Sequence, residues 1–256
     1  MDMNKILHVA TFAGRIMLES GAETYRVEET ICRICTSYGI EITDSFVTPT
    51  GIMVSISNNK ETLSLIKRVN ARDVDLNKVD KINNLSRVIQ GTHIEINDFN
   101  EQLKEINVGD KYSLPVVLIF AGICAGIFST LFGGDVKDLI SAGLIGGIMK
   151  LMYKKFELLG LNEFFINSIS SALATTLAIL MFTLGMASNV DKTVIGSIML
   201  LVPGLSITNA IRDIIAGDYL AGLIRASQAV LIAVSIAVGT GAILSIWINM
   251  LGGSTI

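Results

Sequence analysis

The strongest constraint on the fold is a set of long stretches without a charged residue in the second half of the chain. Leu114 to Phe132 covers 19 residues and Phe164 to Val190 covers 27 residues without Asp, Glu, Lys or Arg, and no charge occurs from Ala226 to Ile256. A helix of about 20 apolar residues is long enough to cross a bilayer. These stretches therefore predict membrane-spanning helices, with a lipid bilayer as their surroundings.

The composition agrees with a membrane protein and shows where its soluble part lies. The chain is 51% hydrophobic and only 17% charged, with a mean hydropathy of +0.59. Nearly all charges lie before Ser113 or in short runs after it. We therefore expect a small α+β soluble domain over residues 1–110, followed by an α-helical membrane domain over 113–256. A net charge of −3 argues against a nucleic-acid partner.

Hydrophobic periodicity predicts the elements of the soluble domain. Apolar residues recur at helical spacing in four segments, and two β-rich runs flank the Pro49–Gly51 turn, as expected for a hairpin. The predicted helices cover about 6–17, 27–38, 76–89 and 96–106, and the predicted strands cover about 41–48, 52–57 and 62–69.

The soluble domain lacks the residue patterns of a known catalytic or metal site. Cys32 and Cys35 form a CxxC pair without a second pair, and small residues on a helix face explain them better than zinc or redox chemistry. Glu23, Arg26 and Glu29 are able to share one side of a helix start, but ordinary surface pairs of Glu23 with Arg26 and of Arg26 with Glu29 are favoured. We therefore expect neither enzyme activity nor a cofactor or metal.

The membrane domain is expected to contain five transmembrane helices. They are predicted within 114–132, 139–153, 164–190, 193–211 and 226–256, with a tight loop at Asp191–Lys192. Small residues in the second segment, such as Gly143 and Gly146, favour close helix packing.

The distribution of basic residues predicts the orientation of these helices. With a cytosolic N-terminus the outer loops hold only Lys137 and Lys192, and the first residues do not resemble a signal peptide. The inner segments would then hold six basic residues, namely Lys111, Lys150, Lys154, Lys155, Arg212 and Arg225. We therefore expect a multi-pass protein of a bacterial cytoplasmic membrane, with its N-terminus in the cytosol.

The fourth predicted span is broken and polar. Pro203 removes a backbone donor and Gly204 relaxes the backbone, which in a membrane is tolerated where the freed groups line a cavity or are buried in protein. If a helix resumes after Gly204, Thr208 and Arg212 share one side, with Asn209 and Asp213 beside them. Such a half-helix suits a small carboxylate-bearing solute, whereas the alternative is a kink with interhelical hydrogen bonds.

Several polar groups near this break are candidate substrate-binding residues. Ser206, Thr208 and Asn209 offer hydrogen bonds, and Arg212 and Arg225 either attract an anion or anchor the helix at the interface. Asp213 and Asp218 are expected to pair with the arginines, with proton binding as the alternative.

Together these motifs resemble the threonine/serine exporter family over essentially the whole chain. The resemblance rests on Gly21–Glu29, on Val47–Gly51, and on Pro203–Gly204 with Thr208–Asp213, Gly217–Asp218 and Arg225. In the first motif it implies roles for Glu23, Thr24, Arg26 and Glu28. It also implies a cytosolic N-terminal domain and transport of small amino or carboxylic acids.

The length of the chain places it near a split branch of that family. Longer members have roughly ten spans, whereas five are predicted here, which implies a separate small membrane protein as the second half. Similar split proteins are associated with export of dicarboxylates such as succinate. The sequence therefore predicts an exporter subunit for threonine/serine-type amino acids or dicarboxylates, and the alternatives are a membrane-anchored sensor or enzyme that works through its N-terminal domain.

Overall fold

The computed structural model describes residues 2–58, 61–70, 73–92, 94–109 and 112–252. Its contacts divide the chain into two compact units. One unit holds Met1–Asp110 with Leu205–Ser227, and the other holds Lys111–Gly204 with Gln228–Ile256. Residues 205–227 therefore pack with the N-terminal residues. Lys111, used above to predict orientation, lies outside the described residues.

The N-terminal residues form the elements that their periodicity predicts. The helices are α1 (Met3–Glu19), α2 (Thr24–Ser37), α3 (Leu76–Gly91) and α4 (Ile96–Val108), and the strands are β1 (Ile42–Thr48), β2 (Gly51–Asn58) and β3 (Glu61–Arg68). Asp2 and Asp75 begin α1 and α3 by accepting hydrogen bonds from backbone N–H groups three residues later. The three strands form one antiparallel sheet in the order β1-β2-β3, with Val47 opposite Ile52 and Val54 opposite Leu65.

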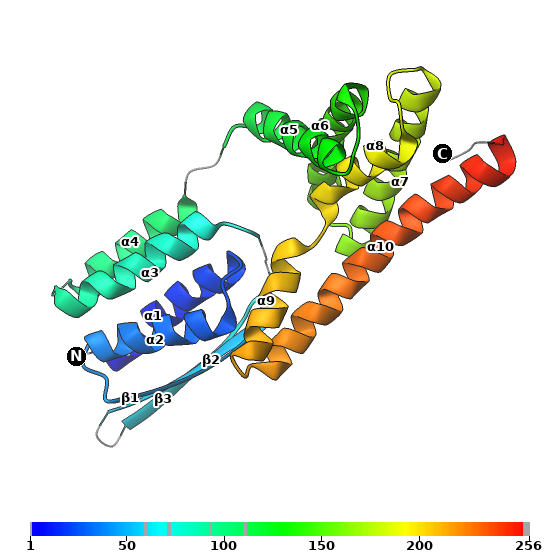
Figure 1. Cartoon of the computed structure of the whole chain (residues 1–256). Coiled ribbons are helices and arrows are strands. Elements are labelled where there is room, and N and C mark those ends of the chain that lie inside the picture. The colour runs from blue at the N-terminus through cyan, green and yellow to red at the C-terminus, as the bar shows by residue number, and fades with distance from the viewer. Residues whose placement is uncertain (1, 59–60, 71–72, 93, 110–111, 253–256) are drawn as a thin grey trace. The chain divides into compact units, whose positions relative to one another are not determined.

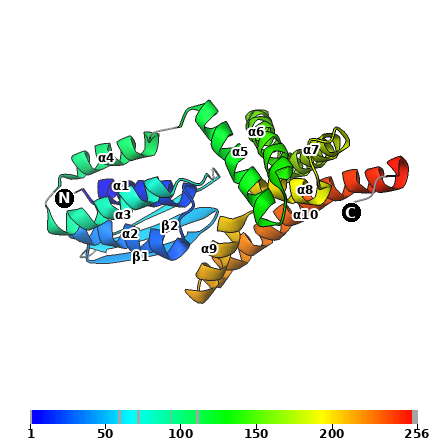
Figure 2. The ribbon, with the colours of Figure 1, turned by 45° about the horizontal axis from the view of Figure 1, so that its top comes forward.

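These elements build three layers around one core (Figures 1 and 2). Helices α1 and α2 lie on the sheet, and α3 and α4 cover their other side. Alternate residues of β2, Ile52, Val54 and Ile56, are buried, as expected for a strand with one covered face. Phe99 and Leu103 bring α4 into the same core. The α+β character of this region is therefore confirmed.

Residues 205–227, which belong to the same unit, lie on two later helices. Helix α9 (Gly204–Ile215) begins directly after Pro203, and α10 (Tyr219–Leu251) follows after a turn at 216–218. Gly217 has φ +94°, which explains the glycine in this turn. Gly222 lets the first turns of α10 approach α9, because a methyl group there would stand 2.9 Å from the carbonyl oxygen of Ala210. Arg225, which the sequence places between the fourth and fifth predicted spans, therefore lies on a helix.

The second unit is helical in the part that the structure describes. It contains α5 (Leu114–Leu131), α6 (Val136–Leu158), α7 (Glu163–Thr183), α8 (Val190–Ile198), the short 3₁₀ helix η1 (Met199–Leu201) and most of α10. A methyl group on Gly146 would stand 2.5 Å from Cβ of Ala125, and one on Gly122 would stand 2.7 Å from the carbonyl oxygen of Gly143. Close packing through small residues of α6 is therefore confirmed.

A buried carboxylate fixes one end of this unit. Asp138, in the first turn of α6, accepts hydrogen bonds from the backbone N–H groups of Ser188 and Asn189 at 2.8 and 2.9 Å and from Thr193 Oγ1 at 3.2 Å. These bonds satisfy donors around the start of α8. Asp191 and Lys192 lie in the first turn of α8, so the predicted loop at these residues is wrong, and the connection is 184–189.

The number of candidate membrane spans is smaller than the sequence suggested. Among the described residues, α5, α7 and α10 are long and apolar enough to cross a bilayer, and the pair formed by 190–201 and 204–215, bent by 56°, adds a fourth if it counts as one span. Helix α6 does not qualify because Lys137, Asp138 and four charges from Lys150 to Glu157 shorten its uncharged stretch. The structure therefore supports three to four spans, and five are not established.

Candidate functional site: a polar cluster on helices α9 and α10

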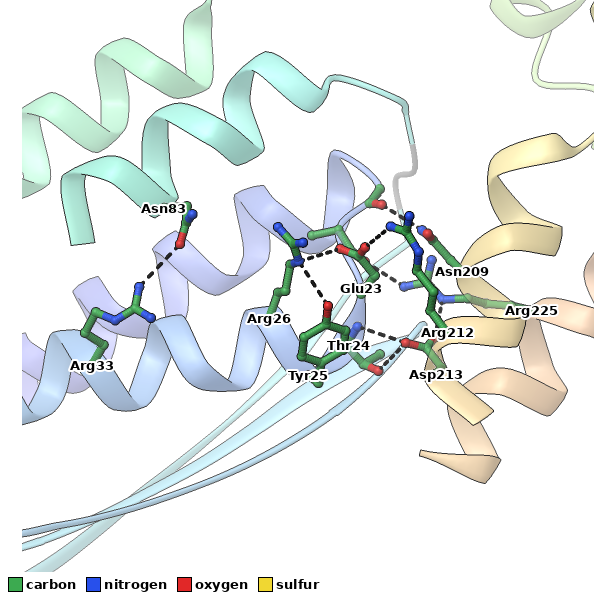
Figure 3. Close-up of polar contacts among 12 residues, drawn as sticks. Glu23, Thr24, Tyr25, Arg26, Arg33, Asn83, Asn209, Arg212, Asp213 and Arg225 are labelled. Carbon is green, nitrogen blue, oxygen red and sulfur yellow. Dashed lines mark hydrogen bonds and ion pairs between the residues drawn. The ribbon is translucent and has the colours of Figure 1, made fainter. Parts of the chain in front are cut away.

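The predicted site residues of the two motifs meet inside the first unit. Gly21–Thr24 leads from the connection after α1 into the first residue of α2, and its polar groups face side chains of α9 and of the first turns of α10 (Figure 3). The partners are Asn209, Arg212 and Asp213 on α9, and Asp218 and Arg225 at and after the next turn. About 190 residues separate the two sides in sequence.

Two of these contacts bind the backbone of the segment. Asn209 Nδ2 donates to the carbonyl oxygen of Gly21 at 2.9 Å, and Arg225 Nη2 donates to that of Ala22 at 2.8 Å. Gly21 has φ +88°, a conformation that favours glycine, and this turns the chain between α1 and α2. The opposite side of the connection is held within the domain, because Asp73 and Asp75 donate backbone N–H groups to the carbonyls of Glu19 and Ser20.

Glu23 pairs with two arginines. Its carboxylate lies 2.5 Å from Arg212 Nη1 and 3.2 Å from Arg26 Nε. Burial raises the pKa of Glu23, but hydrogen bonds from its own backbone and from Arg212, with the charge of Arg26, outweigh burial and hold the pKa below its ordinary value. The carboxylate therefore stays ionised.

This geometry corrects the expectation of surface pairs at the start of α2. The Glu23 side chain is only 8% exposed, so its pair with Arg26 is not an ordinary surface pair. Glu29 pairs with Arg33 instead of Arg26. Glu23 also occupies the N-cap position of α2 without capping the helix through its side chain, which is directed to Arg212.

Thr24 is bound by two carboxylates. Its hydroxyl donates to Asp213 Oδ1 at 2.9 Å and lies 3.2 Å from Asp218 Oδ2, and its backbone N–H donates to Asp213 Oδ1 at 3.3 Å. Both Thr24 and Asp213 have no exposed surface. Asp213 also forms an ion pair with Arg225 at 3.0 Å between Oδ2 and Nε. A buried carboxylate requires such a partner, since an unpaired one would be very costly.

Glu28 adds a third carboxylate beside these two. It accepts a hydrogen bond from the backbone N–H of Val47 at 2.7 Å, which ties the second N-terminal motif to the first. Burial raises the pKa of Glu28, and the charges of Asp218 and Asp213 raise it further, against the lowering effect of the Val47 bond. The pKa of Glu28 is therefore above its ordinary value.

The remaining predicted residues of the break lie at or just after the start of α9. Pro203 lies between η1 and α9, Gly204 is the first residue of α9, and Ser206 and Thr208 follow in its first turns. Leu205 does lie beside the segment, because a methyl group on Gly21 would stand 3.1 Å from Leu205 Cδ2.

Sequence reasoning missed the carbonyl groups of Gly21 and Ala22, and it treated the two motifs separately. The available signal was that both motifs are rich in polar and charged residues. This composition does not show that one motif binds the other.

The CxxC pair has the character of packed side chains. Cys35 is fully buried, and burial raises the pKa of its thiol to about 12, so the reactive thiolate is strongly disfavoured. Cys32 lies 3.4 Å from the hydroxyl of Ser45. Among the described residues no group of three or more His, Cys, Asp or Glu side chains is arranged to hold a metal ion.

Several helices apolar and long enough to cross a bilayer, following an α+β region in the sequence, define a multi-pass membrane protein. The model of the family described as "Putative threonine/serine exporter" (ThrE) matches residues 8–247, so the chain belongs to this family. The family is one of exporters, which confirms the expectation of a transporter rather than an enzyme.

Individual relatives differ in length and in the solutes that their names give. "Probable succinate transporter subunit YjjP" of Klebsiella aerogenes is 20% identical, with 90% of each chain covered. "Probable threonine/serine exporter" of Mycobacterium tuberculosis and "Threonine/serine exporter" of Corynebacterium glutamicum are each 23% identical over 93% and 92% of this chain, but over only 46% and 50% of their own lengths. This chain therefore spans about half of each exporter. No solved structure matches it significantly.

Proposed function

We propose that this protein is an exporter subunit of a bacterial inner membrane for small carboxylate solutes. The solutes are threonine- or serine-type amino acids, or dicarboxylates such as succinate, as the names of the relatives suggest. The N-terminal domain faces the cytosol, and α6 acts as a further span that gives five in total. Family membership supports export, and the polar cluster supports solute binding.

The observation that carries the proposal is the gathering of Asn209, Arg212 and Arg225 with Asp213 and Asp218 on α9 and α10. Arginine recognises carboxylates through its planar set of donors. The aspartates are able to accept from hydroxyl or ammonium groups. The break at Pro203–Gly204 places this helix directly after an apolar segment, where transporters commonly bind solutes. Ser206 and Thr208 complete the proposed binding residues.

We further propose that a separate small membrane protein supplies the second half of the transporter. The two exporters are about twice as long as the region that this chain matches, whereas the relative named a transporter subunit has nearly the same length as this chain. This comparison supports an assembly of two different subunits in the membrane.

The test is efflux from vesicles preloaded with labelled threonine, serine or succinate, with and without the presumed small subunit. We expect efflux of one solute class only with both subunits. Arg212→Ala should reduce the rate at least tenfold, because the loss of a charge-assisted hydrogen bond costs about 1.5–3 kcal/mol. Pro203→Ala and Asn209→Ala should also reduce it. Arg87→Ala, at an exposed position of α3, is the matched control. Unchanged efflux in all three site variants at normal protein levels would contradict the proposal.

A further inference from the structure

The segment Gly21–Thr24 is bound by α9 and α10 in the way that a protein binds a ligand. Side chains of the two helices contact two of its carbonyl oxygens, one backbone N–H, one carboxylate and one hydroxyl. Ordinary contacts between a loop and a helix satisfy some polar groups and leave others to water. Here five polar groups of four consecutive residues are satisfied by one set of side chains.

The chemical groups that the segment presents are those of a small polar solute. The Glu23 carboxylate binds Arg212, and the Thr24 hydroxyl and N–H bind Asp213, with Asp218 next to the hydroxyl. A carboxylate with hydroxyl and amino groups has the same pattern of one acceptor and two donors. A dicarboxylate would match Arg212 but would bring a second negative charge to Asp213 and Asp218.

The exposure of the Glu23–Arg212 pair shows how a solute is able to compete. The side chain of Glu23 is 8% exposed, whereas that of Arg212 is 55% exposed. A carboxylate from solution is thus able to reach the guanidinium while the internal carboxylate still occupies it. Gly21, in its left-handed conformation, separates the bound residues from Glu19 and Ser20, which the domain holds in place.

We infer that Gly21–Thr24 is an intramolecular ligand of the solute site on α9 and α10, and that the transported solute must displace it. This inference rests on the proposed function. The segment competes with the solute, so the apparent affinity is the intrinsic affinity multiplied by the fraction of molecules in which the site is free. The preferred solute is a carboxylate that also carries hydroxyl and amino donors.

The test is equilibrium binding of labelled L-threonine and succinate to the purified full-length chain in nanodiscs. Glu23→Gln and Thr24→Val each remove one competing group, so we expect threonine to bind about tenfold more tightly, within the range of coupling between sites. Glu29→Gln is the control, because it also removes one negative charge from α2, at an exposed residue that pairs with Arg33. This variant should bind threonine with the affinity of the wild type. Affinities in Glu23→Gln and Thr24→Val that equal or fall below that of the wild type would overturn the inference.

A second measurement remains informative if these variants are poorly folded. Ala22 is 1% exposed in the bound segment. In a chain with Cys32, Cys35 and Cys124 replaced, Ala22→Cys should react faster with a thiol reagent when threonine is added, because the solute releases the segment. Slower or unchanged labelling at a saturating threonine concentration would overturn the inference.

The two experiments separate this inference from the proposed function. If Arg212→Ala abolishes threonine binding while Glu23→Gln and Thr24→Val bind as the wild type does, the solute site stands and the intramolecular ligand is rejected. If the folded wild type and every variant, reconstituted with the presumed small subunit, bind neither threonine nor succinate, both proposals are rejected.

Discussion

Glu23 and Glu28 lie five positions apart at the start of α2, and burial acts on both, yet their pKa values move in opposite directions. Glu23 has two arginines within 3.2 Å, so its charged form is favoured despite burial. Glu28 has Asp213 and Asp218 as its charged neighbours, so its charged form is disfavoured. Burial raises the pKa of both carboxyl groups, and the charged groups that face each carboxyl decide whether this increase is reinforced or reversed.

This contrast predicts opposite effects of pH on stability. The raised pKa of Glu28 means that its charge destabilises the fold above that pKa, and this penalty disappears as pH falls below the ordinary value of 4.5. Glu28→Gln should therefore raise the free energy of unfolding at pH 7 by less than about 1 kcal/mol, and raise the Tm accordingly. Near pH 4 its stability should match that of the wild type.

Glu23→Gln should show the reverse, because the lowered pKa stabilises the fold above 4.5 and the benefit is lost as pH falls through the folded pKa. It should cost about 1–2 kcal/mol at pH 7. Thermal unfolding between pH 4 and 7 measures both, with Glu29→Gln as the reference. A Glu28→Gln variant that is less stable than the wild type at pH 7 would contradict this account of the acid cluster.

Helices α9 and α10 hold the cluster together only if they stay close, and Gly222 permits this approach. A methyl group at Gly222 would stand 2.5 Å from Ile214 Cγ1 and 2.9 Å from the carbonyl oxygen of Ala210. Both are too close for any real contact, and one of them is backbone. At Gly241, on the same helix, a methyl group would meet no atom within 4 Å apart from the backbone of its own helix. The two positions therefore form a natural pair for comparison.

We expect Gly222→Ala to cost about 1–3 kcal/mol, because α9 must move away from α10. Gly241→Ala should be neutral or stabilise by up to about 1 kcal/mol, because alanine loses less backbone entropy in a helix. Thermal unfolding of the two purified variants checks this. Equal stabilities would show that α9 and α10 do not approach as closely as described.

The helices and strands of the first unit were predictable because each is encoded by local periodicity. Ile52, Val54 and Ile56 alternate, and the apolar residues of α2 recur at helical spacing, so a short window suffices. The contact of Thr24 with Asp213 was not predictable in this way. A local pattern does not indicate which polar residues far apart in the sequence come into contact. Helix α6 stays a predicted span, because its small residues are typical of membrane helices whereas charged residues lie near both of its ends.

For the whole molecule, the open question of three, four or five spans is decided by the sides on which the connections lie. Val136 and Leu184 follow α5 and α7, and Leu161 lies between α6 and α7; all three are exposed in the structure. Five spans with a cytosolic N-terminus place Val136 and Leu184 outside and Leu161 inside.

Single cysteines at these positions, in a chain without its native cysteines, test this with an impermeant thiol reagent. Val136→Cys and Leu184→Cys should be labelled in intact cells, and Leu161→Cys only after permeabilisation. Labelling of Val136→Cys and Leu161→Cys from the same side would show that α6 does not cross the membrane. The opposite pattern at all three positions would place the N-terminus outside.

The way in which Asn209 and Arg225 hold Gly21 and Ala22 has a consequence for how this region is able to evolve. Both side chains donate to backbone carbonyl oxygens, which every amino acid carries. A substitution at position 22 therefore keeps the carbonyl oxygen to which Arg225 donates. Glu23 with Arg212 and Thr24 with Asp213, in contrast, depend on both side chains. Substitutions should therefore be correlated within these two pairs, whereas Asn209 and Arg225 should be retained without a matching change on the other side.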